Sequence, residues 1–313
     1  MHAYIVQRIL ATVPVMAVVA LFVFALLHLM PGDPAAVIAG EIATVDDIAR
    51  IRAQLGLDRP VHVQFVTWLG QLLQGDLGTS IFSKLPVSHL IAQRLEPTAM
   101  LSLATILFAV TFAVPMGVIA AWRAGSWIDR VVMGFAVLGF SIPVFVLGYL
   151  FIFIFAVELR WLPVQGYKPI GDGFWPFLQS IALPTLTLGV IYIALIARIT
   201  RASVLEVLHE DYIRTAEAKG LGTRAVLLGH ALKAAAVPIV TIIGVGVALL
   251  IGGAVITESV FAIPGLGRLT VDAILRRDYP IIQGVILVFS AAYVLVNLVI
   301  DIIYPLLDPR IRY

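Results

Sequence analysis

The sequence contains no cysteine, and only 13% of its 313 residues carry a charged side chain. Without cysteine, the chain can form no disulfide, no thiolate nucleophile and no cysteine-ligated metal site. Its six histidines are scattered without the spacing of a ligand pair, so the sequence supports no metal site. The motifs of a nucleotide-binding loop, a zinc protease and a serine hydrolase are also absent. We therefore expect neither a catalytic centre nor a cofactor in this chain.

Apolar residues dominate what is present. They make up 61% of the sequence, and the mean hydropathy is +1.02. An ordinary globular domain has only about 45–50% apolar residues. The net charge of +2 is too small to indicate a nucleic-acid-binding surface. The composition therefore predicts an integral membrane protein that does not bind nucleic acid.

Six apolar segments lack Asp, Glu, Lys and Arg and reach the length of about 20 residues that crosses a bilayer as a helix. They are Ile9–Met30, Ala99–Trp122, Val131–Val157, Phe177–Ala197, Ala234–Thr257 and Ile281–Ile300. We expect an all-α protein with six transmembrane helices and both termini on the same side. Prolines inside three of the segments should kink them, namely Pro115, Pro143 and Pro184.

The basic residues predict which side is cytoplasmic. If the termini are cytoplasmic, that side holds 11 Lys and Arg residues, which are Arg8, Arg123, Arg130, Arg198, Arg201, Arg214, Lys219, Arg224, Lys233, Arg310 and Arg312. The short outer loops then hold five, which are Arg160, Lys168, Arg268, Arg276 and Arg277. Cytoplasmic loops carry the excess of positive charge in membrane proteins, and loops beyond about 60 residues are left out of the count. We therefore expect both termini in the cytoplasm.

The loop between the first two spans, residues 31–96, is long enough to fold. Thr44 and Asp47 can cap a helix that bears Ile48, Ile51 and Leu55 and stops at Gly56. A second helical run follows Pro60 and carries Phe65, Leu69 and Leu72. This pattern predicts a small helical extracytoplasmic domain, which either shields the bundle or helps to receive a docking protein.

Residues 201–237 form a long polar interruption in the second half of the chain. The spacing predicts two helices, with Ser203 and Glu206 as a capping box for the first and Thr223 as the cap of the second. Glu210 and Arg214 are four residues apart and should form a surface pair. Gly220 and Gly222 mark the turn. The pattern alone is compatible with an amphipathic hairpin lying on lipid headgroups.

Two other features of the second half allow more than one interpretation. Gly244, Ala248 and Gly252 recur every four residues, a spacing that allows close helix packing or leaves room for a solute. Between Glu258 and Pro280, the residues Pro264, Gly265 and Gly267 should break the helix, and Val271 to Leu275 should form a short one, so the segment is either a re-entrant segment or an ordinary loop. The ionisable residues His28, Glu258 and Asp301 lie at span ends, where an interfacial position is the simpler interpretation.

Residues 211–220, DYIRTAEAKG, together with the following HALK, resemble the coupling loop of ABC-transporter permeases of the dipeptide/oligopeptide/nickel family. The general family pattern begins with Glu-Ala-Ala, then three residues, then Gly. When it is aligned on Gly220, that opening falls on Arg214, Thr215 and Ala216, and Lys233 replaces its proline. Further matches lie in order along the whole chain: PGDP at 31–34, LGLDRP at 55–60, GDLGTS at 75–80, LPVQGY at 162–167, ESVFAIPGLG at 258–267, RDYP at 277–280 and LDPRIRY at 307–313.

The resemblance implies a type I ABC importer permease fold in a bacterial inner membrane, with this chain as the first of two permease subunits. Residues 1–30 would hold the first span, residues 31–96 the outer domain, and residues 97–313 a five-helix core with the coupling loop 201–237. Implied partners are a second homologous permease, two ATP-binding subunits that hold ATP and Mg, a substrate-binding protein, a peptide substrate and membrane lipid. The implied ATPase contacts are Ala216, Glu217, Ala218, Lys219, Gly220, Leu221 and Gly222.

Two other classes of function, a secondary carrier and a membrane scaffold, make different demands on the sequence. A secondary carrier would need chargeable groups inside the membrane, which are nearly absent. A membrane scaffold whose hairpin recruits a partner is the third hypothesis. Within the transporter hypothesis, dipeptides or short oligopeptides are expected, with glutathione or a nickel chelate as the alternatives.

Overall fold

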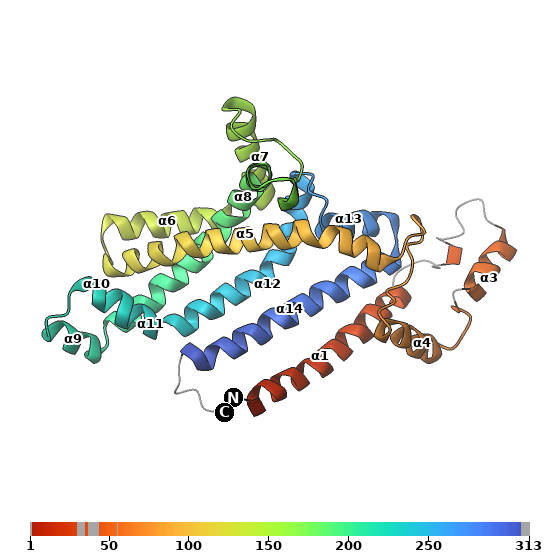
Figure 1. Cartoon of the computed structure of the whole chain (residues 1–313), viewed down its shortest axis with the longest axis horizontal. Helices are drawn as coiled ribbons and strands as arrows, with labels where there is room; N and C mark the ends of the chain where they lie inside the picture. The colour runs from red at the N-terminus through yellow and green to blue at the C-terminus, as the bar shows by residue number, and fades with distance from the viewer. Residues whose placement is uncertain (1, 30–34, 37–43, 55, 308–313) are drawn as a thin grey trace. The chain divides into compact units, whose positions relative to one another are not determined.

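A computed structural model describes residues 2–29, 35–36, 44–54 and 56–307 of the chain. Within these ranges the regular secondary structure is helical, apart from one isolated bridge between Thr79 and Pro86, and turns and loops join the helices. The helices of the first half are α1 (His2–Leu29), α3 (Val45–Gln54), α4 (Val61–Leu73), α5 (Val87–Trp122), α6 (Trp127–Ser141), α7 (Val144–Phe151), the π-helix η1 (Ile152–Glu158) and the 3-10 turn η2 (Ile170–Asp172) (Figure 1). Those of the second half are α8 (Phe174–Leu208), α9 (Asp211–Ala218), α10 (Thr223–Ala225), the π-helix η3 (Val226–Ala231), α11 (Leu232–Ala234), α12 (Ala236–Val260), α13 (Leu266–Arg276) and α14 (Tyr279–Leu307).

The chain divides into two compact units. Unit 1 comprises Met1–Leu95 and Leu269–Val294, and unit 2 comprises Glu96–Arg268 and Leu295–Tyr313. The expected boundary between residues 96 and 97 lies one residue from a unit boundary. The structure also assigns 269–294 to the unit that contains the N-terminal helix, a grouping that the sequence does not reveal because these residues are distant along the chain.

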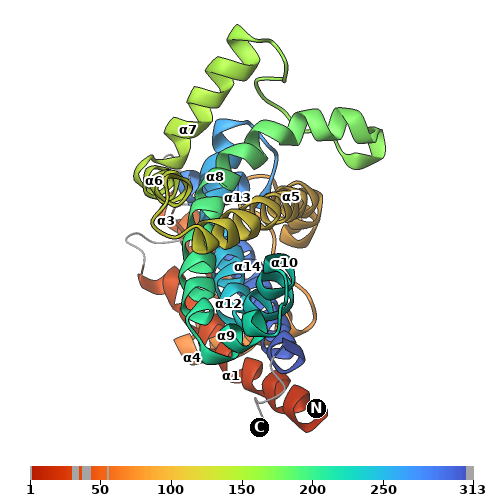
Figure 2. The same ribbon diagram turned by 90° about the vertical axis from the view of Figure 1, so that its left-hand side faces the viewer.

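The membrane spans match the predicted all-α fold, with one segment strongly bent. Five helices are long and apolar enough to cross a membrane: Val6–Leu26 within α1, α5, α8, α12 and α14. The remaining predicted segment, 131–157, is divided between α6 and α7 with η1, which meet at an angle of 104°. Figure 2 shows α7 leading away from α6 at this bend. Pro143 sits at the break as the N-cap of α7, whereas Pro115 and Pro184 lie inside the unbroken helices α5 and α8.

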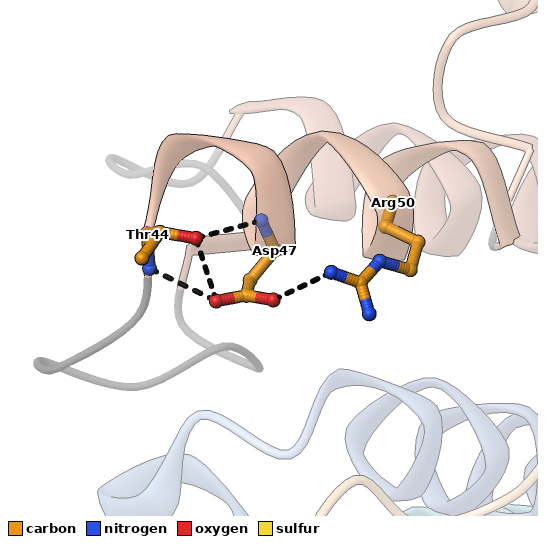
Figure 3. A network of polar contacts seen from close by, with 3 residues as sticks. All are labelled: Thr44, Asp47 and Arg50. Atoms are coloured by element: carbon orange, nitrogen blue, oxygen red, sulfur yellow. Dashed lines mark hydrogen bonds and ion pairs between the residues drawn. The ribbon is translucent and has the colours of Figure 1, made fainter.

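The predicted helices of the outer segment are present in unit 1. The Asp47 carboxylate accepts bonds from the Thr44 hydroxyl and N–H, and the Asp47 N–H donates to the Thr44 hydroxyl, which closes the first turn of α3 (Figure 3). Arg50 donates to the other oxygen of Asp47 at 2.8 Å. α4 begins after Pro60, as predicted, since proline is tolerated where the first N–H groups of a helix lack partners. The predicted end of the first span at Met30, the PGDP motif at 31–34, Leu55 and residues 308–313 lie outside the described residues.

The core of unit 2 is built around α8, whose buried side chains include Leu188, Tyr192 and Ile196. Glycines on the neighbouring helices bring the backbones close to it. A Cβ at Gly117 of α5 would lie 2.7 Å from the Ala197 carbonyl oxygen, and one at Gly139 of α6 would lie 2.9 Å from the Ala194 Cβ. These close approaches join α5, α6 and α8 into one packed layer, since small residues let helices meet at short distance in lipid.

The segment after α12 differs from its prediction. α13 begins at Leu266 rather than near Val271, so Gly267 lies inside the helix and does not break it. The turn before it is made by residues 261–264, where Ala262 has a positive φ of 51°. The reason for the early start is the buried carboxylate of Glu258, which accepts a bond from the Arg268 N–H at 2.9 Å and thereby satisfies a free donor in the first turn of α13.

Candidate coupling site

The polar segment that starts at Arg201 is a helical hairpin, but its first helix is not a new one. α8 continues without interruption through Ser203 to Leu208, so the predicted capping box of Ser203 and Glu206 is wrong. Ser203 lies in mid-helix because the apolar run of α8 continues into the polar segment through Val204, which is fully buried. The first separate helix of the hairpin is α9, with Glu210 as its N-cap residue.

α9 rests on the rest of unit 2 through a buried underside. Ile213 is 1% exposed and Ala216 is 8% exposed, and Ile213 packs in a cluster of apolar side chains. The cluster comprises Val118, Ala121, Val204, Val226, Ala231, Ala235 and Ile239. These residues come from the ends of α5 and α8, from η3 and from the start of α12. The cluster packs α9 against the ends of three long helices.

The turn after α9 is closed by the geometry that requires glycine at Gly220. The Gly220 N–H donates to the Glu217 carbonyl oxygen at 2.9 Å, and the Leu221 N–H donates to the Ala216 carbonyl oxygen at 3.3 Å. This pair of bonds is a Schellman motif, in which the residue after the C-cap takes a left-handed conformation. Gly220 has φ of +81°, which confirms the predicted turn position.

The second arm of the hairpin runs into α12 with only a brief irregularity. Gly222 is the N-cap residue and Thr223 is already helical with no side-chain cap, so the predicted cap at Thr223 is wrong. α10, η3 and α11 follow one another directly from Thr223 to Ala234. The π-helix η3 in the middle of this arm places the side chains of Val226 and Ala231 in the buried cluster.

The seven predicted coupling residues fall into two groups. Ala216 lies on the buried underside, whereas Glu217, Ala218, Lys219, Gly220, Leu221 and Gly222 are exposed. Figure 1 shows α9 and α10 together at the left-hand end of the view. The surface ion pair differs from the expected one, because Arg214 contacts Asp211 at 3.4 Å rather than Glu210. Asp211 is in the first turn of α9, where its charge also favours the helix dipole.

Gly244, Ala248 and Gly252 of α12 were predicted either to allow close helix packing or to leave room for a solute. Their surroundings differ. A Cβ at Gly244 would clash with the Ile300 Cδ1, so this glycine packs against α14. Ala248 is half-buried. Gly252 is exposed, and a Cβ there would meet nothing within 4 Å.

Two buried polar contacts in unit 2 were not predicted from the sequence. Glu258 lies near the end of α12, as predicted, and is 0% exposed. Its carboxylate accepts a bond from the Thr98 hydroxyl at 2.6 Å, and that hydroxyl accepts the Leu266 N–H at 2.8 Å. The polar pair is separated by 160 residues, so the one local signal was Gly265 and Gly267, whose lack of side chains leaves space for the carboxylate.

A second long-range contact joins Asp129 in the first turn of α6 to Arg201 of α8. The Arg201 Nε and Nη2 groups donate to the two oxygens of the Asp129 carboxylate, with Nη2 to Oδ2 at 2.7 Å. Asp129 is 5% exposed. No local pattern predicts this pair, because 72 residues separate its members.

Tyr167, in the connection between η1 and α8, donates a hydrogen bond to Glu96 at 3.3 Å. Burial raises the pKa of the Tyr167 hydroxyl to about 12, and the nearby Glu96 charge adds to this shift. The hydroxyl therefore stays protonated as a hydrogen-bond donor at neutral pH. Among the described residues, no group of three or more His, Asp or Glu side chains has the arrangement of a metal site.

An inner-membrane transporter fold accounts for these spans and for the hairpin. A solved inward-facing MetNI methionine ABC transporter superposes with a TM-score of 0.58 at 20% identity, covering 70% of this chain and 96% of that one. The chain matches the family model described as binding-protein-dependent transport system inner membrane component over residues 113–313. A companion model for the N-terminal part of such membrane components matches residues 1–104.

Full-length relatives agree with this assignment. The chain is 55% identical over 313 residues to a probable peptide ABC transporter permease protein, y4tP, of Sinorhizobium fredii, covering 100% of both chains. It is 45% identical over 310 residues to the glutathione transport system permease protein GsiC of Escherichia coli strain K12, covering 99% of both. The protein belongs to the family of inner-membrane components of binding-protein-dependent transport systems. It is a multi-pass ABC permease subunit without catalytic activity of its own, and its partner ATPase subunits bind the ATP.

Proposed function

We propose that this chain pairs with a second, homologous permease to form the channel of an ATP-driven importer for short peptides. Two ATPase subunits would bind below the membrane, and an extracytoplasmic binding protein would deliver the substrate. Both termini would be cytoplasmic, as the excess of Lys and Arg on that side favours. The full-length similarity to a probable peptide permease supports peptides as the substrate class, and the similarity to GsiC extends it to glutathione, which is itself a short peptide.

The observation that carries the proposal is the hairpin turn at Glu217–Gly222. It combines an exposed surface with a buried underside that is fixed to the ends of α5, α8 and α12. An amphipathic hairpin lying on lipid would direct its apolar face toward the membrane, yet Ile213 and Ala216 are already buried within the protein. The free surface of the turn carries Glu217 and Lys219, which suits a polar protein groove.

Substrate uptake tests the proposal. Labelled dipeptide and labelled glutathione would be offered to cells in which the gene is deleted and then restored, while either ATP or the proton gradient is collapsed. The proposal predicts gene-dependent uptake that follows ATP and persists without the gradient. Uptake that follows the gradient would refute it, and gene-dependent uptake of neither probe would refute the peptide assignment.

The small residues of α12 have two roles in this proposal. We assign Gly244 to packing against α14 and the region of Ala248 and Gly252 to the translocation path. The open space beside Gly252 supports this division, because a glycine that serves only close packing would have a neighbour at its Cα.

A further inference from the structure

From the geometry of Asp129 and Arg201 we infer that this ion pair is the clamp that makes α6 follow the coupling hairpin when the ATPase subunits move. The inference rests on the proposed function, since it assigns a role in the transmission of force to a contact outside the hairpin itself. Asp129 and Arg201 would be positioning residues that touch neither the ATPase nor the substrate.

Arg201 lies on α8, the long helix that leads directly into the hairpin. α8 is unbroken from Phe174 to Leu208, and α9 starts at Asp211 after only two connecting residues. Val204, one turn beyond Arg201, is part of the buried cluster under Ile213 of α9. The last turns of α8 and the helix α9 therefore move as one body.

Asp129 fixes the other side of the contact. Besides the two bonds from Arg201, its carboxylate accepts the Gly125 N–H at 2.9 Å, and Gly125 has a positive φ of 78°. The Ser126 side chain caps the same helix by accepting the Asp129 N–H. The carboxylate thus joins the loop between α5 and α6, the first turn of α6 and the guanidinium of α8.

The type of contact suits the transmission of motion better than it suits stability. A planar guanidinium that meets a carboxylate with two parallel bonds fixes orientation as well as distance. Buried ion pairs contribute little net stability, because desolvation of both charges offsets their attraction. The apolar packing of Gly117 and Gly139 against α8 already holds the three helices together, so the pair adds a directional link at the end nearest the hairpin.

The test compares two conservative substitutions in the purified transporter, obtained through an affinity tag on this chain and reconstituted in proteoliposomes with the binding protein of the same system supplied on the substrate side. Arg201→Lys keeps the positive charge but removes the planar guanidinium that makes two parallel bonds to Asp129. The matched control is Arg130→Lys, which changes the exposed arginine next to Asp129 in the same way. Labelled glutathione, labelled dialanine and the phosphate released from ATP are counted together, which gives the number of peptides moved per ATP.

We expect Arg201→Lys to assemble and hydrolyse ATP, while the peptides moved per ATP fall about tenfold, the equivalent of one charge-assisted hydrogen bond lost. Arg130→Lys should keep the wild-type ratio. An assembled Arg201→Lys complex with the wild-type ratio overturns the clamp. A wild-type complex that moves neither peptide with ATP overturns the proposed function instead, so the two failures are distinguishable.

A second variant covers the case in which the first does not assemble. The chain has no native cysteine, so Asp129→Cys with Arg201→Cys introduces the only pair of thiols in it. A bifunctional thiol reagent that bridges the two positions should restore the ratio of peptides to ATP that the unbridged protein has lost. No gain on bridging, with bridging verified by mass, would contradict a mechanical role.

Discussion

The hydroxyl of Thr98 donates a 2.6 Å hydrogen bond to the carboxylate of Glu258, a side chain with no exposed surface. The contact joins α5 to the end of α12 and holds the start of α13, whose Leu266 N–H bonds the same hydroxyl. A buried carboxylate is costly unless it is hydrogen-bonded, so the contact defines how these three helices meet.

Thr98→Val should therefore destabilise the protein by about 1–3 kcal/mol, because it removes a bond to a buried charge and leaves a buried N–H with one partner fewer. Thermal unfolding of the purified transporter in detergent measures the effect. Thr111→Val is the matched control, since Thr111 lies on the same helix, is exposed and bonds only back to the Leu107 carbonyl oxygen. Equal melting temperatures for the two variants would show that the buried contact contributes nothing.

Gly220→Ala should impair transport, whereas Gly229→Ala should not. Alanine in the left-handed conformation of Gly220 costs about 1–2 kcal/mol, which the turn can relieve only by changing its shape. Gly229 lies in the helical segment η3, outside the turn, and has open space at its Cα, so alanine fits there. ATP-dependent uptake by cells with equal amounts of each variant in the membrane is the measurement. Equal uptake by both variants would contradict a role for the shape of the turn.

Local interactions are the part of this structure that the sequence predicts well. The Thr44 and Asp47 capping box, the start of α4 after Pro60 and the turn at Gly220 each depend on residues within a few positions of one another. Hydropathy locates the spans for the same reason, since the length of an apolar run is a local property.

The errors arise where distant residues decide the outcome. Ser203 and Glu206 have the spacing of a cap, yet α8 continues through them because Val204 is buried by α9 and η3. The burial of Glu258 was not predicted, because its partner Thr98 lies on another helix, 160 residues away. The Asp129–Arg201 pair likewise requires the packing of α6 on α8, which depends on Gly139 and has no signature in either segment alone.

Gly252→Leu should block uptake with little loss of stability if this part of α12 lines the path, because nothing lies within 4 Å of a Cβ placed at this position. Gly134→Leu is the control, as Gly134 is exposed on α6 and also has open space. Melting temperature and uptake are measured for both. Normal uptake by a stable Gly252→Leu variant would remove Gly252 from the path.

The start of α3 should loosen in acid. Hydrogen bonds from the Thr44 hydroxyl and N–H hold the pKa of Asp47 below its ordinary value of 3.8, with a smaller effect from the Arg50 charge. A carboxyl whose pKa is lower in the folded state stabilises the fold above its unfolded pKa, and this contribution disappears as the pH falls through the folded pKa.

A spin label at Ala49→Cys on α3 should therefore become more mobile below pH 3.8, and Thr44→Ala should produce the same mobility at neutral pH. A label at the exposed Val66→Cys of α4 serves as the control and should not respond to Thr44→Ala. An unchanged spectrum of the Ala49 label in the Thr44→Ala protein would show that the cap does not hold the helix.

The most direct test of the account asks what the hairpin turn touches. A single thiol placed at Leu221→Cys, in a chain without other cysteines, would be cross-linked in the assembled transporter, and the linked subunit identified by mass. Leu275→Cys on α13, an exposed position on the predicted outer side, is the matched control. The account predicts that Leu221→Cys links to an ATPase subunit and that Leu275→Cys does not. An assembled complex in which Leu221→Cys never reaches an ATPase subunit, or in which Leu275→Cys does, would contradict it.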